Sequence, residues 1–248
     1  MVLTTPTGKF ANVVGGVLWS GGVPPSNLRT GQPLRSDPLA YVSTPTPDPA
    51  WIARSTPAYI RKSQTLPSGV YNSTIGWAGA TLTLNPGVYN GLEAGGAAGT
   101  KLILKAGQYF FTGPVNLKGM AQFSTSETDE VSLYFTCKSP SSGMPAPCTP
   151  SNVSGAGQLS TGAISTITLK APTSGSQKGI SIFYDRANTN ILNMQGNTTF
   201  NVGTIYALKS NTHLGGTNTM NASSVVIGSL AMNGTGQIEA TYDASKLP

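Results

Sequence analysis

Charged side chains are scarce in this sequence: only 10% of its 248 residues are Asp, Glu, Lys or Arg. The nine acidic residues and the single histidine leave little material for a catalytic or metal-binding cluster. No apolar run approaches the roughly 18 residues of a membrane-spanning helix, so we expect no membrane span in this chain. Met1–Thr4 also lacks the basic and apolar parts that begin a signal peptide.

Clustered positive charge is missing too, although the formal net charge is +6. Lysines and arginines occur singly, and Arg61-Lys62 is the only adjacent pair. Proteins that bind nucleic acid gather such residues on one face or in runs. We therefore expect no nucleic-acid partner, and only a diffuse attraction to acidic surfaces such as anionic cell-wall polymers.

Residues that form turns are abundant, with 30 glycines and 18 prolines, whereas hydrophobic residues make up 38%. This composition disfavours long helices but is too apolar for a disordered chain. An all-β fold is predicted.

One short phrase of sequence occurs three times, as a turn that leads into a Val/Tyr/Phe segment. Its copies are Leu66–Tyr71, Leu84–Tyr89 and Leu104–Tyr109, whose leucines lie 18 and 20 residues apart. A period near twenty residues indicates a solenoid, because each unit buries its apolar face only against its neighbours. We predict a single-stranded parallel β-helix, right-handed as parallel crossovers generally are.

A second pattern continues the period, with a glycine followed four places later by an apolar residue, as in Gly119 with Phe123. Strand candidates lie between these turns, and in Thr166–Leu169 the alternation predicts that Ile167 and Leu169 face inward. Together the repeated phrases, glycine turns and strand candidates predict roughly seven to ten coils, with a rise of about 4.8 Å per coil. The predicted repeat turns contain Gly69, Gly87, Gly107, Gly119, Gly196, Gly216 and Gly234.

Residues 1–60 lack the repeat and are rich in proline and glycine. They form either a flexible linker or an extended segment that docks on the solenoid and caps its open N-terminal edge. Trp51, Ile52, Tyr59 and Ile60 are too apolar for a free linker, which favours docking of residues 50–60. The predicted division is therefore a partly docked segment, 1–60, and a β-helix, 61–248.

Two cysteines, Cys137 and Cys148, flank a loop rich in Pro, Ser and Gly. A disulfide is the leading interpretation, with two unpaired thiols as the alternative, and it would indicate an oxidising compartment. With no other thiol and one histidine, a metal site at these cysteines is not expected.

The one acidic cluster, Glu127, Asp129 and Glu130, supplies oxygens that could bind calcium, but a solvated loop explains it equally simply. His213 lies in a repeat turn and is interpreted as structural or exposed, because no serine has a nucleophile signature. We predict no catalytic residues and no cofactor, calcium excepted.

Asp185 and Arg186, at the end of a strand, form a candidate surface site. Polysaccharide-cleaving β-helices place acids and an arginine in an outer groove, so this pair supports an alternative function as a lyase or hydrolase. An ion pair between the two at the surface is the simpler interpretation.

Several segments in order resemble one family. The segments are Asp37–Ala40, the repeated phrase, the Cys-flanked loop, Leu169–Gly175, Gly179–Arg186 and Gly203–Ala207. Over most of residues 37–240 the chain resembles the C-terminal region of TadE/TadG-like proteins, which are associated with tight-adherence (Flp-type) pilus assembly in bacteria. It departs from that family in lacking the N-terminal membrane segment.

The resemblance implies a protein of the bacterial surface or exterior, with no catalytic residues to carry over. The expected function is a non-catalytic structural or adhesive module. Its expected partners are pilus or envelope proteins or surface glycans, or further copies of itself in an oligomer or filament.

Overall fold

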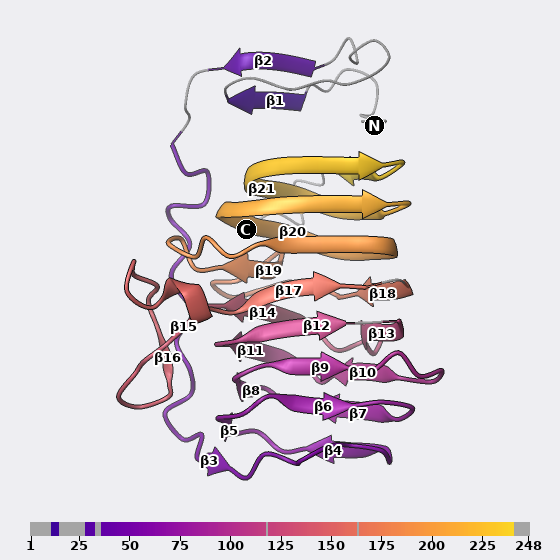
Figure 1. The fold of residues 1–248 in the computed structure, drawn as a ribbon. Helices are drawn as coiled ribbons and strands as arrows, with labels where there is room; N and C mark the ends of the chain where they lie inside the picture. The colour runs from indigo at the N-terminus through magenta and orange to yellow at the C-terminus, as the bar shows by residue number, and fades with distance from the viewer. Residues whose placement is uncertain (1–10, 15–27, 33–35, 118, 163, 241–248) are drawn as a thin grey trace.

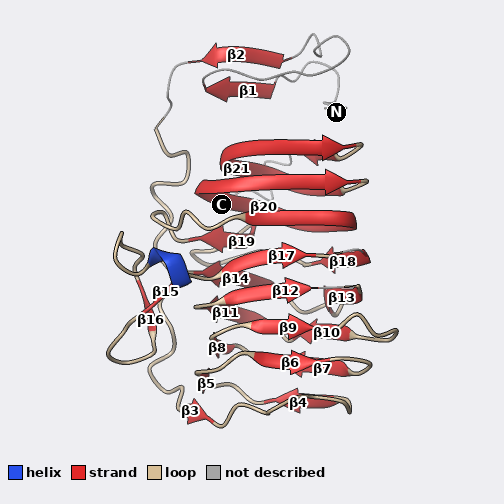
Figure 2. Cartoon of the chain, viewed as in Figure 1, coloured by secondary structure: helices blue, strands red, loops and turns tan. Residues whose placement is uncertain are grey.

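The computed structural model describes residues 11–14, 28–32, 36–117, 119–162 and 164–240. It is a parallel β-solenoid of about 9 turns (Figure 1). Strands make up nearly all of its regular structure, and the one helix among the described residues is the short η1 (Val153–Gly155), shown in Figure 2. The all-β class, the solenoid and the approximate number of coils predicted from the sequence are confirmed.

Each coil contributes a short strand to each of three parallel ladders, which we call faces A, B and C. Two long strands, β20 (Leu192–Gly216) and β21 (Thr219–Gly234), bend around the corners and take part in all three. Face A also contains β5 (Val70–Tyr71), β8 (Gly87–Tyr89), β11 (Gly107–Phe111), β14 (Val131–Phe135) and β19 (Ile180–Tyr184). Face B contains β6 (Ile75–Trp77), β9 (Leu92–Ala94), β12 (Pro114–Leu117) and β17 (Gln158–Thr161). Face C contains β4 (Gln64–Leu66), β7 (Thr81–Leu84), β10 (Lys101–Leu104), β13 (Met120–Thr125), β18 (Ile164–Thr168) and β22 (Gln237–Ala240).

The interior is filled by side chains that repeat in register from coil to coil. On face A, Tyr71, Tyr89, Phe111, Phe135 and Tyr184 form a continuous aromatic stack with ring centroids 4.9–6.0 Å apart. On face C, Ile167 and Leu169 point inward and are buried, as the alternation predicted. Because each coil buries its apolar side chains on the next, the core runs the length of the solenoid.

The tyrosine of the repeated phrase has a specific role. The hydroxyls of Tyr71, Tyr89 and Tyr109 each donate to the carbonyl oxygen four residues earlier. The distances to the oxygens of Pro67, Asn85 and Lys105 are 2.9, 2.6 and 2.7 Å respectively. A buried tyrosine needs such a partner for its hydroxyl, and here the partner is the turn of its own coil. The phrase therefore closes each turn while its ring joins the core.

Glycines at the corners allow the coils to stack closely. Gly216 has φ +92°, and a Cβ atom there would lie 2.4 Å from the carbonyl oxygen of Gly196 one coil below. Gly234 has φ +98° and repeats this approach against Gly216. Of the other predicted turn glycines, Gly87 and Gly107 are the first residues of strands β8 and β11.

Face A is unusual because its outward side chains are also apolar. Seven of them lie in register along the solenoid: Val70, Val88, Phe110, Tyr134, Phe183, Tyr206 and Val226. Residues 36–51, which we call the strap, cover this column. Leu39 and Val42 are buried against it, and Trp51 meets the ring of Phe110 edge-on at 5.9 Å.

The strap runs along the side of the solenoid from the last coils to the first (Figure 1). It leads into β3 (Ala53–Arg54), which pairs with β5, and Ile60 then pairs with Trp77. Of the residues expected to dock, Trp51 is half-buried and Ile60 is buried, whereas Ile52 and Tyr59 are 60% and 47% exposed. The segment thus covers a long face of the solenoid and also contributes to its first coil.

Two small elements lie outside the three faces. β1 (Ala11–Val14) and β2 (Leu28–Gln32) pair in parallel with each other. In the loop between β14 and β17, β15 (Cys137–Lys138) and β16 (Pro145–Ala146) form an antiparallel pair, and Cys137 and Cys148 form the predicted disulfide. The described part of the chain contains no helix long and apolar enough to cross a membrane.

Candidate functional site

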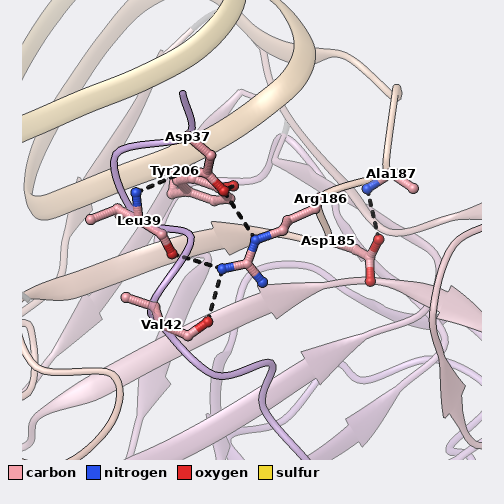
Figure 3. Close-up of polar contacts among 7 residues, drawn as sticks. All are labelled: Asp37, Leu39, Val42, Asp185, Arg186, Ala187 and Tyr206. Carbon is pink, nitrogen blue, oxygen red and sulfur yellow. Dashed lines mark hydrogen bonds and ion pairs between the residues drawn. The ribbon is translucent and has the colours of Figure 1, made fainter. Parts of the chain in front are cut away.

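The strap and the solenoid are joined by a polar cluster around Arg186 (Figure 3). Arg186 follows β19, and its guanidinium donates to a carboxylate oxygen of Asp37 at 3.1 Å. The same group donates to the carbonyl oxygens of Leu39 and Val42 at 2.7 and 2.8 Å. One side chain therefore bonds three residues of the strap, which its planar, multiply donating group suits it to do. We call Asp37, Arg186 and Tyr206 the clasp.

Aromatic rings complete the clasp. The Arg186 guanidinium lies 5.6 and 5.8 Å from the ring centroids of Phe183 and Tyr206, which belong to the outward column of face A. The Tyr206 hydroxyl donates to Asp37 at 2.7 Å. A cation over partly desolvated rings gains electrostatic attraction in addition to its hydrogen bonds.

These contacts set the ionisation of the clasp. Burial of Asp37 opposes its charge, but the bonds from the Tyr206 hydroxyl, the Leu39 N–H and Arg186 together hold the pKa of Asp37 below its usual value. Burial and the bond to Asp37 raise the pKa of Tyr206. At neutral pH the clasp is therefore an aspartate, an arginine cation and a neutral tyrosine.

Asp185 and Arg186, predicted as a surface pair, have different partners. Asp185 is only 7% exposed and accepts hydrogen bonds from the Tyr134 hydroxyl at 2.7 Å and the Ala187 N–H at 2.9 Å. Figure 3 shows its carboxylate directed away from the Arg186 guanidinium. Asp185 thus fixes the end of β19, and Arg186 holds the strap.

The three residues of the acidic cluster before β14 also differ in their partners and exposure. Asp129 accepts from the Ser126 hydroxyl and lies 3.7 Å from the Lys105 ammonium. Glu130 accepts from the backbone N–H of Thr173 at 2.9 Å and pairs with Lys170 at 3.5 Å, whereas Glu127 is exposed. Among the described residues no three His, Cys, Asp or Glu side chains group closely enough to hold a metal ion. Calcium binding by Glu127, Asp129 and Glu130 stays a prediction.

A groove of about 470 Å³ follows the corner between faces C and A over the later coils. Along one side, the Asn221 amide donates to the Asn201 side-chain oxygen of the preceding coil at 2.8 Å. Along the other, the loop after β18 contributes Lys170, Pro172 and Lys178. The groove is mainly apolar, with amides and lysines at its rim.

Face C presents a flat outer surface of hydroxyl and amide groups. One outward column consists of Thr81, Lys101, Gln122, Thr166, Thr199, Thr219 and Gln237. The neighbouring column consists of Thr65, Thr83, Ile103, Ser124, Thr168, Asn201, Asn221 and Glu239. Because these positions are in register, equivalent side chains repeat at about 4.8 Å along the axis.

His213 lies on face B, in β20, where its Nε2 is 3.0 Å from the side-chain amide of Asn233 in the next coil. This places it in an outer polar column. The contact is one of several side-chain bonds between neighbouring coils, such as that from Asn116 to Glu93 at 2.9 Å.

Sequence reasoning missed Asp37 and Tyr206 as members of the clasp, and Tyr134 as the partner of Asp185. Asp37 lies 149 residues from Arg186 in the sequence, so no local pattern could reveal their contact. The only available signal was Tyr134 and Tyr206 at outward positions of otherwise apolar strands.

Comparisons with known proteins give no further information about the site. No family model, no curated protein and no solved structure matches this chain.

Proposed function

We propose that this protein is a non-catalytic structural and adhesive module of the bacterial surface, which acts in pilus assembly or surface attachment. The proposal combines the resemblance to TadE/TadG-like proteins with the geometry of face C. Location outside the cytoplasm is supported by the disulfide, because such bonds persist in oxidising compartments.

Face C is the observation that carries the proposal. Its two outward columns offer a broad, flat array of hydroxyl and amide groups along the solenoid, interrupted by few charges. Stacked faces of repeat proteins serve as extended binding surfaces in general. Most positions of the two columns hold short Thr, Ser and Asn side chains, which lose less conformational entropy than long ones when a partner covers them. This suits contact with a pilus or envelope protein.

The strap supports the same function by stiffening the module. Asp37 of the strap bonds Tyr206 in the later coils, and Trp51 packs on Phe110. The chain then pairs with Val70 through Ala53, so this segment resists sliding or separation of the coils in between. A module that transmits force between a cell and a surface needs this resistance. A filament of such modules is a further form that the function could take.

The test is deletion of the gene in the producing bacterium, with pili counted by electron microscopy and attached cells counted on a surface. We expect fewer pili, reduced attachment or both, with recovery when the wild-type gene is restored. Complementation with Thr168→Glu and Thr199→Glu together adds two charges to face C and should fail to restore the defect. Ser141→Glu with Ser142→Glu, on the exposed disulfide loop, adds the same charge, is the matched control and should restore it.

Unchanged pili and unchanged attachment in the deletion strain would refute the proposal. The alternative function, cleavage of a polysaccharide, makes a different prediction. Purified protein would then release new chain ends from a polysaccharide, with or without added calcium, and Asp185→Asn would abolish that release.

A further inference from the structure

The first coils carry only positive charge. Between Asp48 and Glu93 the sequence contains three charged residues, and all are basic: Arg54, Arg61 and Lys62. Arg61 and Lys62 lie next to each other between β3 and β4 and are both exposed. The only adjacent basic pair of the chain thus lies in its first coil.

An exposed aromatic ring lies beside this pair. Tyr59 packs over Gly76 in the next coil, where an added Cβ would come 2.8 Å from the ring, and its hydroxyl reaches Gly95 one coil further. Because neither glycine has a side chain, both leave room for the tyrosine ring, which stays 47% exposed. The Arg61 guanidinium lies 5.1 Å from the ring centroid.

These side chains border a shallow hollow of about 340 Å³. Its lining consists of Pro57, Tyr59, Ile60, Arg61, Lys62 and Gln64. Gln64 is exposed and occupies the position that buried leucines, Leu82 and Leu102, occupy in the following coils. The hollow therefore combines a ring, two cations and an amide.

The position of the hollow keeps it accessible. Its lining lies in the first coil, where Tyr59, Arg61 and Lys62 are exposed. Strands β3 and β4 of this coil lie at the opposite end of the solenoid from β21 (Figure 1). In the outward column of face B, Tyr59 is followed by Gly76 and then by Glu93, which accepts a 2.9 Å bond from Asn116. Glu93, two coils away, is the first acidic side chain in that column.

We propose that this hollow binds an acidic polysaccharide at the first-coil end of the solenoid. A uronate ring packs against Tyr59, its carboxylate accepts hydrogen bonds from Arg61 and Lys62, and Gln64 bonds a sugar hydroxyl. An arginine fork matches a carboxylate in shape as well as charge. The inference rests on the proposed adhesive function and names the ligand class that the module holds.

The size of the charged cluster favours a glycan over nucleic acid. Proteins that hold nucleic acid by its backbone neutralise about 6–10 phosphates and stack successive bases on several aromatic rings. The hollow has one ring and two cations, which fit a single acidic sugar unit.

Calorimetric titration of the full chain with sodium polygalacturonate oligomers tests the inference, with neutral dextran oligomers as the comparison ligand. We expect binding of polygalacturonate alone. Arg61→Gln with Lys62→Gln should weaken it at least tenfold, and Tyr59→Ala about tenfold. Tyr59→Trp, which retains a ring, should restore most of the affinity. The matched control, Lys178→Gln with Lys209→Gln, removes the same charge elsewhere and should change affinity less than about twofold. The tenfold loss expected at the hollow corresponds to about 1.4 kcal/mol of binding free energy.

Three results would overturn the inference: no binding of polygalacturonate, equal weakening by the control pair, or tighter binding of single-stranded DNA with the same dependence on Tyr59 and Arg61. Cells that carry the Arg61→Gln, Lys62→Gln variant separate this inference from the proposed function. Normal attachment by these cells to a polygalacturonate-coated surface, in a strain whose attachment requires the protein, would refute the site and leave the function standing. Binding that depends on the hollow, in a protein whose deletion changes neither pili nor attachment, would support the site and refute the function.

Discussion

Replacing Arg186 with alanine should release the strap from the later coils. The side chain makes three hydrogen bonds to the strap, to a carboxylate oxygen of Asp37 and to the carbonyl oxygens of Leu39 and Val42. Its loss leaves the partly buried Asp37 carboxylate without its cation and removes the Arg186 donor from the Val42 carbonyl oxygen, whereas the Leu39 carbonyl oxygen keeps its bond from the Val42 N–H. The strap would then be held on face A by apolar contacts, by the Tyr206 hydroxyl bond to Asp37 and by the Gln177 amide bond to the Ser43 carbonyl oxygen.

The expected magnitude follows from these bonds. A hydrogen bond to a charged group contributes roughly 1.5–3 kcal/mol when it is well buried. The Arg186 side chain is 31% exposed, so we discount each bond to about 1 kcal/mol for solvent screening, which gives about 3 kcal/mol in all. Arg186→Lys keeps the charge but not the fork, and should lose about half as much.

Two measurements check this expectation. Urea unfolding gives the change in free energy of unfolding, and limited chymotrypsin digestion reports local release of the strap, which contains Tyr41 and Trp51. Lys170→Ala is the control, because its 3.5 Å pair with Glu130 lies at the solvent-exposed surface and should contribute little to the free energy of unfolding. Digestion of the strap should be faster in Arg186→Ala and unchanged in the control.

A double-mutant cycle with Asp37→Asn isolates the direct pair. We expect a coupling free energy of about 1 kcal/mol between the two positions, since one of the three bonds joins them. If Arg186→Ala left both unfolding and digestion unchanged, the clasp would not hold the strap, and this account of it would be wrong.

Three further changes test other parts of the fold. The lowered pKa of Asp37 means that its contribution to stability is complete above the unfolded-state pKa of about 3.9 and is lost as pH falls through the still lower folded value. The urea midpoint should therefore fall as the pH is lowered below about 4, and less so in Asp37→Asn. Gly216→Ala should destabilise the solenoid by about 2 kcal/mol or more in urea unfolding, because of the positive φ and the approach of Gly196, whereas Gly155→Ala, with open space around it, should be nearly neutral. Replacing Cys137 and Cys148 by serine should cost about 3 kcal/mol by the loop-entropy relation, measurable as a lower urea midpoint, and reduction of the wild type should reproduce the loss.

Much of the solenoid could be predicted because its rules are local. Each coil repeats a turn, an inward apolar pair and a corner glycine, so the period of about twenty residues is visible in the sequence. The ladders nevertheless shift the register of the third phrase. Tyr109 pairs with Gly87, and Phe111 pairs with Tyr89, although the phrases align Tyr109 with Tyr89. A shift of two residues keeps every side chain on its own face, so the repeat does not determine it.

The clasp could not be predicted, because it depends on contacts between distant parts of the chain. Arg186 is adjacent in sequence to an acid, Asp185, and the simplest interpretation joins the two. Successive side chains at the end of a strand point in different directions, so Asp185 reaches Tyr134 while Arg186 reaches the strap.

The need for the strap, however, was present in the sequence. Strands such as Val131–Phe135 and Ile180–Tyr184 are apolar at successive positions, and all ten of their side chains are buried. A strand whose two sides are both apolar must be covered on both, and the inner side of a solenoid provides only one cover. The other cover has to come from outside the repeat, and the proline-rich stretch before the first phrase contains leucine, valine and tryptophan that suit an apolar surface. The continuous apolar strands therefore indicate which face needs an outer cover, and the apolar residues of the non-repeating segment indicate what can cover it. Neither inference requires a known contact between the two.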